Sequence, residues 1–228
     1  LGFKDLSPAE LENRDNRLLT LKDLIESSKT LIQMNNDLSS KSDVVDHLGN
    51  RRVKPNGKLL EAKLYQSLIQ IKRQVQDRMA LLDHATLTAA QLISPKVISA
   101  NFTSFFKISP LSQIVDQVNV LSELSHKRKL TSTGPGGIKL KTKSGAEIRD
   151  VHPSHYGRIC PINTPEGQNV GLVLALSIYS RLNEFGFIET PYYKVKKGKI
   201  SEEIVWLNAL EEESHIIARG DIDRDKNN

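Results

Sequence analysis

The stretch from Phe105 to Gly171 constrains the fold most, because it is dense in glycine, proline, histidine, arginine and asparagine. It contains a basic cluster at His126–Lys129, a glycine-rich break at Gly134–Gly137 and a second polar run at His152–Gly167. Glycine and proline fix the backbone in turns, and the polar side chains between them are free to contact other molecules. We therefore expect an irregular region that carries a binding site.

The excess positive charge lies in the same stretch. The formal net charge is +5, and residues 107–158 hold nine lysines and arginines against four acids, while the rest of the chain is balanced. A local basic excess is typical of surfaces that meet phosphate groups. A solvated basic loop has the same composition, so charge alone leaves nucleic-acid binding and a plain surface equally open.

Length and composition set the outer limits. The chain has 228 residues and a mean hydropathy of −0.37, which suits one or two globular domains. No apolar run approaches the length of a membrane span, and the single cysteine, Cys160, excludes an internal disulfide framework and suits a reducing compartment. Because the chain opens at Leu1 without a methionine, we expect a piece of a longer protein.

The first half of the chain is predicted to be mostly helical. Thr20 with Asp23 forms a helix start, and the apolar spacing continues to about Met34. A turn at Pro55–Gly57 precedes a long helix to about Leu82, and Thr88 and Ser94-Pro95 start two shorter helices. The apolar stripe of the long helix indicates a core or a partner helix; it comprises Leu60, Leu64, Leu68, Ile71, Val75 and Met79.

The second half is predicted to mix loops, one buried helix and short strands. Thr164-Pro165-Glu166 reads as a helix start, and the apolar run behind it predicts a buried helix to about Glu184. Weak alternation around Lys197-Gly198 predicts a hairpin over residues 192–200, and residues 215–219 are predicted to form a last strand. Together these elements predict an α+β fold.

Three patterns are weak candidates for metal or anion binding. His152, His155 and Cys160 provide too few ligands for a zinc site, and Pro153 breaks a helical histidine pair. Asp221, Asp223 and Asp225 lack the glycine and the glutamate of a calcium loop. The Gly134–Gly137 amides could cradle an anion, but the P-loop ending is missing, so a plain turn explains them equally well. We therefore assign neither a metal ligand nor a catalytic residue.

Several ordered blocks resemble a known family. The residues from Leu111 to Gly137, the block Arg149–Arg158, the segment Thr164–Gly167 and the segment Phe187–Tyr192 closely resemble the β subunit of bacterial-type multisubunit RNA polymerase. The upstream block Asp46–Arg52 resembles another part of that subunit, and the matches keep their order from about residue 45 to 195. Blocks of this length in one order are a specific signal.

The resemblance implies an organisation and a function. Residues 1–104 are expected to belong to the mostly helical lobe or protrusion region, residues 105–191 to the rifamycin-pocket and fork region, and residues 192–228 to the start of the next strand segment. The family is a nucleotidyltransferase that makes RNA on a DNA template with two metal ions. Its Mg²⁺ ligands lie in the partner β′ subunit, so this chain alone is expected to be inactive and to bind no cofactor.

The resemblance also implies partners and contacts. The expected partners are the β′, α, ω and σ subunits, the DNA template, the nascent RNA and rifamycin antibiotics, in the cytoplasm and nucleoid or in a plastid stroma, without a membrane. The expected rifamycin-pocket and RNA-channel residues are Leu111, Gln113, Ile114, Asp116, His126, Lys129, Thr131, Gly134, Pro165, Glu166 and Asn169. The expected nucleic-acid contacts are Lys127, Arg128, Lys139, Lys141 and Lys143, the last three in the fork loop.

The sequence departs from the family pattern at four positions. Ile114 stands where the family usually has phenylalanine, Lys129 replaces arginine, Thr131 replaces serine, and Asn163 replaces glutamate. A stand-alone nucleic-acid-binding protein that reuses these blocks is the main alternative, and a metal hydrolase built on His152, His155 and Cys160 is a third class with too few ligands.

Overall fold

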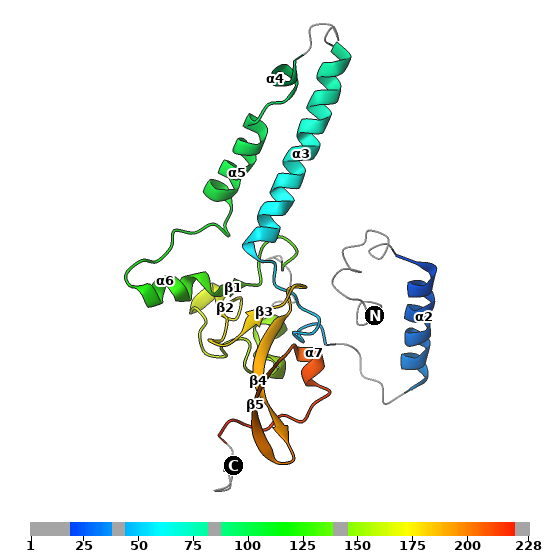
Figure 1. Ribbon diagram of the computed structural model, residues 1–228, viewed down its shortest axis with the longest axis vertical. Helices are drawn as coiled ribbons and strands as arrows, with labels where there is room; N and C mark the ends of the chain where they lie inside the picture. Colours follow the sequence, from blue (N-terminus) through cyan, green and yellow to red (C-terminus); the bar gives the residue numbers. More distant parts are fainter. Residues whose placement is uncertain (1–18, 38–43, 82–87, 139–145, 222–228) are drawn as a thin grey trace.

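The computed structural model describes residues 19–37, 44–81, 88–138 and 146–221, and the account below is confined to them. Figure 1 shows a helical arm, a central region of short strands and loops, and a β-hairpin that extends from it toward the C-terminus. Helix α2 (Leu21–Asn36) lies apart from these elements. The α+β prediction is confirmed.

The helix starts predicted in the first half of the chain are confirmed. Thr20 caps α2: its hydroxyl accepts the Asp23 amide hydrogen, and the Asp23 carboxylate accepts the Thr20 amide hydrogen at 2.8 Å. Helix α3 (Asn56–Leu81) begins directly after Pro55, helix α4 (Ala89–Leu92) begins after Thr88, and helix α5 (Lys96–Ile108) follows Pro95. None of the helices within the described ranges is long and apolar enough to cross a membrane.

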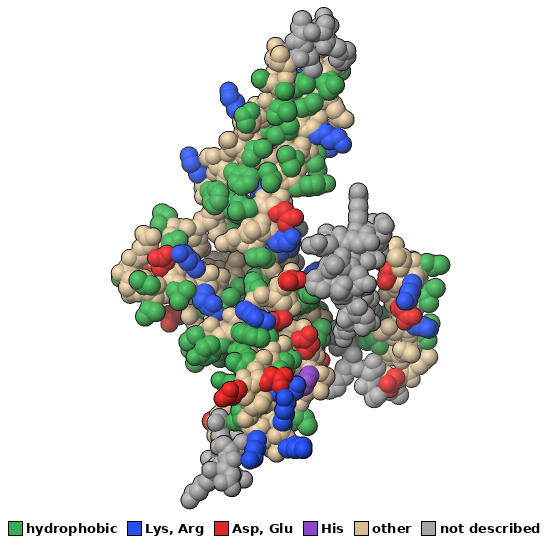
Figure 2. Space-filling view, in the orientation of Figure 1, with side chains coloured by type: hydrophobic (Ala, Val, Ile, Leu, Met, Phe, Trp, Pro, Cys, Tyr) green, Lys and Arg blue, Asp and Glu red, His purple; other side chains and the backbone are tan. Residues whose placement is uncertain are grey.

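Helices α3 and α5 pack side by side to form the arm. At their contact the Ser67 side chain is fully buried, its hydroxyl donates to the Lys63 carbonyl at 2.8 Å, and the Asn101 amide donates to Ser67 Oγ at 2.8 Å. The small serine lets the two helices approach closely. Figure 2 shows apolar side chains over the arm, and Tyr65 and Phe106 are among the exposed ones.

The central region holds two small antiparallel sheets. Strand β1 (Lys129–Thr131) follows helix α6 (Val120–Lys127) and pairs with strand β2 (Val173–Ala175). Strands β3 (Arg181–Leu182), β4 (Ile188–Lys196) and β5 (Lys199–Leu207) form the second sheet in that order, followed by helix α7 (Ala209–Glu212). The predicted hairpin is confirmed, because Lys197 and Gly198 both have positive φ angles (52° and 78°), as a two-residue hairpin turn requires.

The apolar core is small and lies between the two sheets. Leu48, Ile159, Ile188 and Ala209 form its buried cluster, with Val53, Leu130, Leu174, Leu176 and Leu182 half-buried around it. A Cβ atom at Gly49 would lie only 2.4 Å from Leu210 Cγ. Because glycine has no side chain, the 44–50 turn can approach the core here. The core therefore joins segments that are about 160 residues apart in sequence.

Two predicted elements are wrong. The buried helix over residues 164–184 is absent: the segment forms the 3-10 turn η4 (Gly167–Asn169), strand β2 and strand β3. Gly167 and Gly171 have φ angles of +83° and +70°, which no α-helix accepts, and Val173 to Ala175 pair with β1 instead. Ile178 and Tyr179, which the helix was expected to bury, are mostly exposed.

The predicted strand over residues 215–219 is also wrong. This segment follows α7 as a turn and extended chain and pairs with none of the described strands. Its start is held by a local bond, since the His215 amide donates to the Glu212 carbonyl at 2.9 Å. The segment from His215 to Arg219 is too short for its apolar pattern to distinguish a strand from a loop.

Candidate nucleic-acid interface

The pairing of β1 with β2 joins two segments that are more than 40 residues apart. Lys129 lies opposite Ala175, and Thr131 lies opposite Val173. Lys129 also shares a small cavity of about 180 Å³ with Pro165 and Asn163. The structure thus brings together Lys129, Thr131 and Pro165, three residues that the sequence placed in one site.

A hydrogen-bonded unit forms where the loop before α6 folds back on it. The Asp116 amide donates to His126 Nδ1 at 3.1 Å, and His126 Nε2 lies 2.9 Å from Gln113 Oε1. Because Nδ1 accepts a hydrogen bond, Nε2 carries the hydrogen that is shared with Gln113 Oε1. The imidazole therefore links the Gln113 side chain to the Asp116 backbone, while Ile114 between them is 96% exposed.

The glycine-rich break packs on the residue that opens the site. Gly134 has a φ angle of +115°, and a Cβ atom there would lie 3.1 Å from Leu111 Cδ1. Gly137 donates its amide hydrogen to the Gly134 carbonyl at 2.9 Å, which closes a tight turn. Leu111 and Gly134, both predicted site residues, are therefore neighbours, and a side chain at position 134 would be strained.

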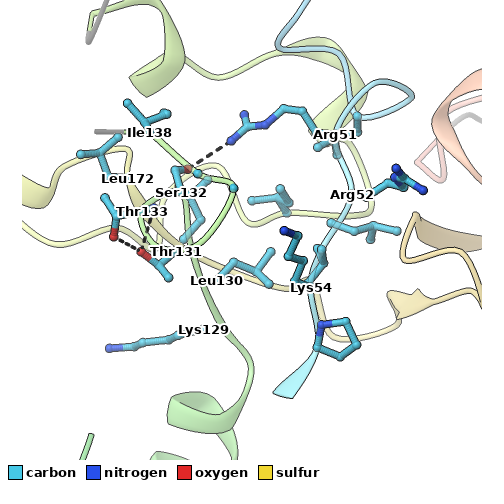
Figure 3. A pocket seen from close by; sticks show the side chains of 18 of the residues that line it. Arg51, Arg52, Lys54, Lys129, Leu130, Thr131, Ser132, Thr133, Ile138 and Leu172 are labelled. Atoms are coloured by element: carbon cyan, nitrogen blue, oxygen red, sulfur yellow. Dashed lines mark hydrogen bonds between the residues drawn. The ribbon is translucent and has the colours of Figure 1, made fainter. Parts of the chain in front are cut away.

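A larger cavity of about 690 Å³ also borders β1, and sequence analysis did not assign three of its cations, Arg51, Arg52 and Lys54, to a site (Figure 3). Arg51 donates to Ser132 Oγ at 3.1 Å and lies 3.9 Å from Asp46, and Lys54 reaches Gly136, where an added Cβ would meet its Nζ at 2.6 Å. The signal that could have found these residues was the density of polar groups between Asp46 and Val53.

The cavity has a strongly positive rim and an apolar floor. Five of its lining residues are cations and one is an acid, namely Arg51, Arg52, Lys54, Lys127 and Lys129 against Asp46. The floor is formed by core residues such as Leu130, Leu174 and Ile188. An excess of cations at an open hollow attracts anionic groups.

The predicted nucleic-acid residues divide into three groups. Lys127 pairs with Glu123 one turn earlier on α6. The Arg128 guanidinium donates to the carbonyls of Ser177, Ile178 and Ser180, so it holds the 177–180 loop against the end of α6. Lys139, Lys141 and Lys143 lie outside the described residues.

The remaining predicted site residues lie on the loop that leads into β2. Pro165 is half-buried, whereas Glu166, just before η4, and Asn169, its last residue, are exposed. The Thr164 hydroxyl donates to the Val173 carbonyl at 3.0 Å and accepts the Gly171 amide hydrogen at 2.8 Å. One side chain thus closes the base of the loop and leaves its tip open to solvent.

The histidine and cysteine candidates do not assemble a metal site. Among the described residues, no group of three or more His, Cys, Asp or Glu side chains has the geometry to hold a metal ion. His152 Nδ1 lies 2.8 Å from Ser154 Oγ, and His155 is buried with no hydrogen-bond partner for Nε2. Burial, with Arg51 and His152 nearby, lowers the pKa of His155 to about 4, so its ring is neutral near pH 7.

Comparison with known proteins identifies the family. A family model described as RNA polymerase Rpb2, domain 3 matches residues 113–182, and one described as RNA polymerase beta subunit external 1 domain matches residues 192–228. Two relatives are DNA-directed RNA polymerase β subunits from Anaeromyxobacter sp. strain Fw109-5, 48% identical over 216 residues, and Myxococcus xanthus, 47% identical over 215 residues. In both cases the match covers 94% of this chain and 15% of the relative.

A third relative, from Bdellovibrio bacteriovorus, is 49% identical over 203 residues, which is 89% of this chain and 14% of the relative. Residues 113–182, which contain both strands of the β1–β2 pair, thus match an RNA polymerase family model. The chain is a member of the bacterial-type RNA polymerase β-subunit family and spans about 15% of the length of the relatives it matches.

Proposed function

We propose that residues 111–137 and 165–173 form part of the wall of the channel that holds the RNA–DNA hybrid in a DNA-directed RNA polymerase. The relatives carry the name of that enzyme's β subunit, and the match covers both segments. The chain contributes binding surface to the proposed activity, which is the template-directed joining of ribonucleotides.

The observation that carries the proposal is the β1–β2 pair. It sets Lys129 and Thr131 beside the loop of Pro165, so residues from two distant segments face one surface. A lysine at such a surface neutralises phosphate charge without reading base identity. The side chains of Gln113 and His126, which are joined by a hydrogen bond, add polar groups that suit ribose oxygens.

The rest of the enzyme supplies the chemistry in this proposal. The β′ subunit would hold the Mg²⁺ ions, and the α, ω and σ subunits, the DNA template and the nascent RNA would be the other partners, in the cytoplasm or a plastid stroma. Because the family's metal ligands lie in the β′ subunit, we assign no metal-dependent step to this chain and expect it to be inactive alone.

Two finer assignments belong to the same proposal. Rifamycins would bind against Leu111, Gln113, Ile114, Asp116, His126, Lys129, Thr131, Gly134, Pro165, Glu166 and Asn169, the surface that would otherwise face the hybrid. The segment from Gly134 to about Glu147 would form the fork loop near the downstream edge of the open DNA. Its lysines would contact phosphates there.

The experiment compares two lysine variants of the polymerase that would contain this chain, which we call the parent polymerase. Lys129→Ala should shorten the lifetime of stalled elongation complexes and reduce the slope of log lifetime against log salt by about one, because one phosphate contact is lost. Lys72→Ala is the matched control, because Lys72 is exposed on α3, away from the β1–β2 pair. Equal lifetimes and slopes for Lys129→Ala and the unchanged enzyme would contradict the proposal.

A further inference from the structure

The loop that carries Pro165, Glu166 and Asn169 is anchored by a residue outside it. Arg149, at the end of the 3-10 turn η2 (Glu147–Arg149), donates from Nη1 to the Gln168 carbonyl at 2.8 Å and to the Val170 carbonyl at 2.6 Å. One guanidinium nitrogen thus bonds the loop backbone on both sides of Asn169. Bonds from a charged donor are stronger than those between neutral groups.

The backbone of Arg149 also touches the loop. A Cβ atom at Gly171 would lie 2.5 Å from the Arg149 carbonyl oxygen and 2.6 Å from its Cα. Gly171 has a φ angle of +70°, so it accepts both the left-handed conformation and the close approach. Arg149 therefore meets the loop through its backbone and through its side chain, at contacts 19 to 22 residues away in sequence.

These contacts act on the side of the loop that Thr164 does not hold. The Thr164 hydroxyl joins Gly171 and Val173 at the base, whereas Arg149 holds the carbonyls of Gln168 and Val170 beside the exposed tip. The amides of Val170 and Leu172 are bonded within the loop, to Gly167 and Asn169. Without the Arg149 guanidinium, the carbonyls of Gln168 and Val170 would lose these bonds, and the tip could shift relative to β1.

We propose that Arg149 is a positioning residue for the 164–173 loop, one that holds Glu166 and Asn169 in place for the hybrid or for a rifamycin. The inference rests on the proposed function, because that function gives the loop tip its contacts. Arg149 counts toward the basic excess of residues 107–158, yet its guanidinium holds carbonyl oxygens of the chain itself. Its role is therefore distinct from that of a phosphate-binding cation.

The first test measures amide hydrogen exchange in the assembled parent polymerase. In Arg149→Met, the peptide spanning residues 163–173 should exchange about five- to tenfold faster, because the bonds from a charged donor are lost. Arg149→Lys should lie between this variant and the unchanged enzyme, since a lysine reaches the carbonyls as a flexible point charge. Arg73→Met, on the exposed face of α3, is the control and should leave the peptide unchanged.

The second test measures the lifetime of stalled elongation complexes across a salt series. Arg149→Met should shorten the lifetime about two- to fivefold at every salt concentration without changing the salt slope, because no phosphate contact is removed. A slope reduced by about one would show that Arg149 itself contacts a phosphate, which would overturn the positioning role.

Two other results would also overturn the inference. Unchanged exchange in Arg149→Met would show that the loop does not depend on Arg149. Faster exchange with an unchanged lifetime would show that the loop position does not matter to the hybrid. Lys129→Ala separates this last failure from a failure of the proposed function. If Lys129→Ala shortens the lifetime and Arg149→Met does not, the channel-wall proposal stands and only the role of Arg149 is rejected.

Discussion

Arg158 and Glu212 form an ion pair in the interior of the central region, where the Arg158 side chain is fully buried. The guanidinium also donates to the carbonyls of Ser154, Ile188 and Leu207, at 3.2, 3.1 and 2.9 Å. It thus joins the 3-10 turn η3 (Pro153–His155), strand β4, the end of β5 and helix α7. A buried charge is tolerated only when its donors are paired in this way.

Replacing Arg158 with methionine should destabilise the parent enzyme strongly. The change leaves the Glu212 carboxylate and three carbonyls without their partner, which typically costs about 3–5 kcal/mol. The measurement is the temperature of half-inactivation of the parent polymerase. Lys196→Met, which removes an exposed partner of Glu203, is the control and should leave stability nearly unchanged. Equal half-inactivation temperatures for the two variants would contradict the assigned role of Arg158.

The buried ring of His155 should make stability depend on pH. Its pKa in the folded chain is about 4, below the ordinary 6.5, so the unfolded chain binds more protons between these values. Stability from this group is therefore fully present above pH 6.5 and falls as the pH drops, by about 2 kcal/mol from pH 7 to pH 5. The groups that face the ring are Arg51, His152 and Asp46.

Inactivation rates of the parent polymerase at pH 7 and pH 5 test this expectation, with His155→Gln as the comparison. Because glutamine does not titrate, His155→Gln should lack the loss of about 2 kcal/mol of stability between pH 7 and pH 5. His215→Gln, an exposed histidine close to α7, is the control and should keep it. An acid sensitivity that is the same in His155→Gln and in the unchanged enzyme would mean that other groups set it.

Neutralising Lys139, Lys141 and Lys143 together should weaken the hold of the parent enzyme on nucleic acid without changing its sequence preference. Phosphate contacts carry no base information, and each lost contact reduces the salt slope by at most about one. The readout is the lifetime of elongation complexes across a salt series on two templates of different sequence. A lifetime that does not change at any salt concentration would show that these lysines face water.

The parent polymerase should be less sensitive to rifamycin than the usual family pattern would make it. Ile114 lacks an aromatic ring, Lys129 lacks the planar fork of arginine, and Thr131 adds a methyl group. Together these differences should cost roughly 1–3 kcal/mol, or about a five- to hundredfold loss of affinity. In the structure Ile114 is almost fully exposed and Thr131 Oγ1 lies 2.9 Å from Thr133 Oγ1.

Inhibition is measured for the unchanged enzyme and for the triple variant Ile114→Phe, Lys129→Arg and Thr131→Ser. The triple variant should be inhibited at lower rifamycin concentrations. Ile216→Phe, at a fully exposed position after α7, controls for a new aromatic side chain and should leave inhibition unchanged. If the triple variant needs the same drug concentration as the unchanged enzyme, these three positions do not determine rifamycin binding.

Helices α2 to α5 could be predicted from sequence because their signals are local. Each start signal lies within one turn of its helix: Thr20 and Asp23 for α2, Pro55 for α3 and Pro95 for α5. The apolar residues from Leu60 to Met79 are spaced three or four apart, a period that only an α-helix has. The sequence signal for the hairpin, at Lys197-Gly198, was also local. Its two residues are the ones whose φ angles are positive.

The segment from Thr164 to Glu184 could not be predicted because its structure depends on distant partners. Val173 to Ala175 are apolar on every side, a pattern shared by buried helices and buried strands, and β1 decides between them. The resemblance indicated part of the candidate site, but it did not indicate the contacts of Arg51, Lys54 and Arg149. Their roles depend on Ser132, Gly136 and the 168–170 backbone, which lie far from them in sequence.

The most direct test of the channel assignment is site-specific crosslinking in the parent polymerase. A photoreactive amino acid at position 131 should crosslink to RNA in stalled complexes that contain a labelled transcript, because Thr131 would face the hybrid. The same amino acid at position 65, where Tyr65 is exposed on α3 away from the β1–β2 pair, should give no RNA adduct. RNA adducts at position 131 alone are the predicted result. Their absence at position 131, in complexes that still extend RNA, would contradict the account.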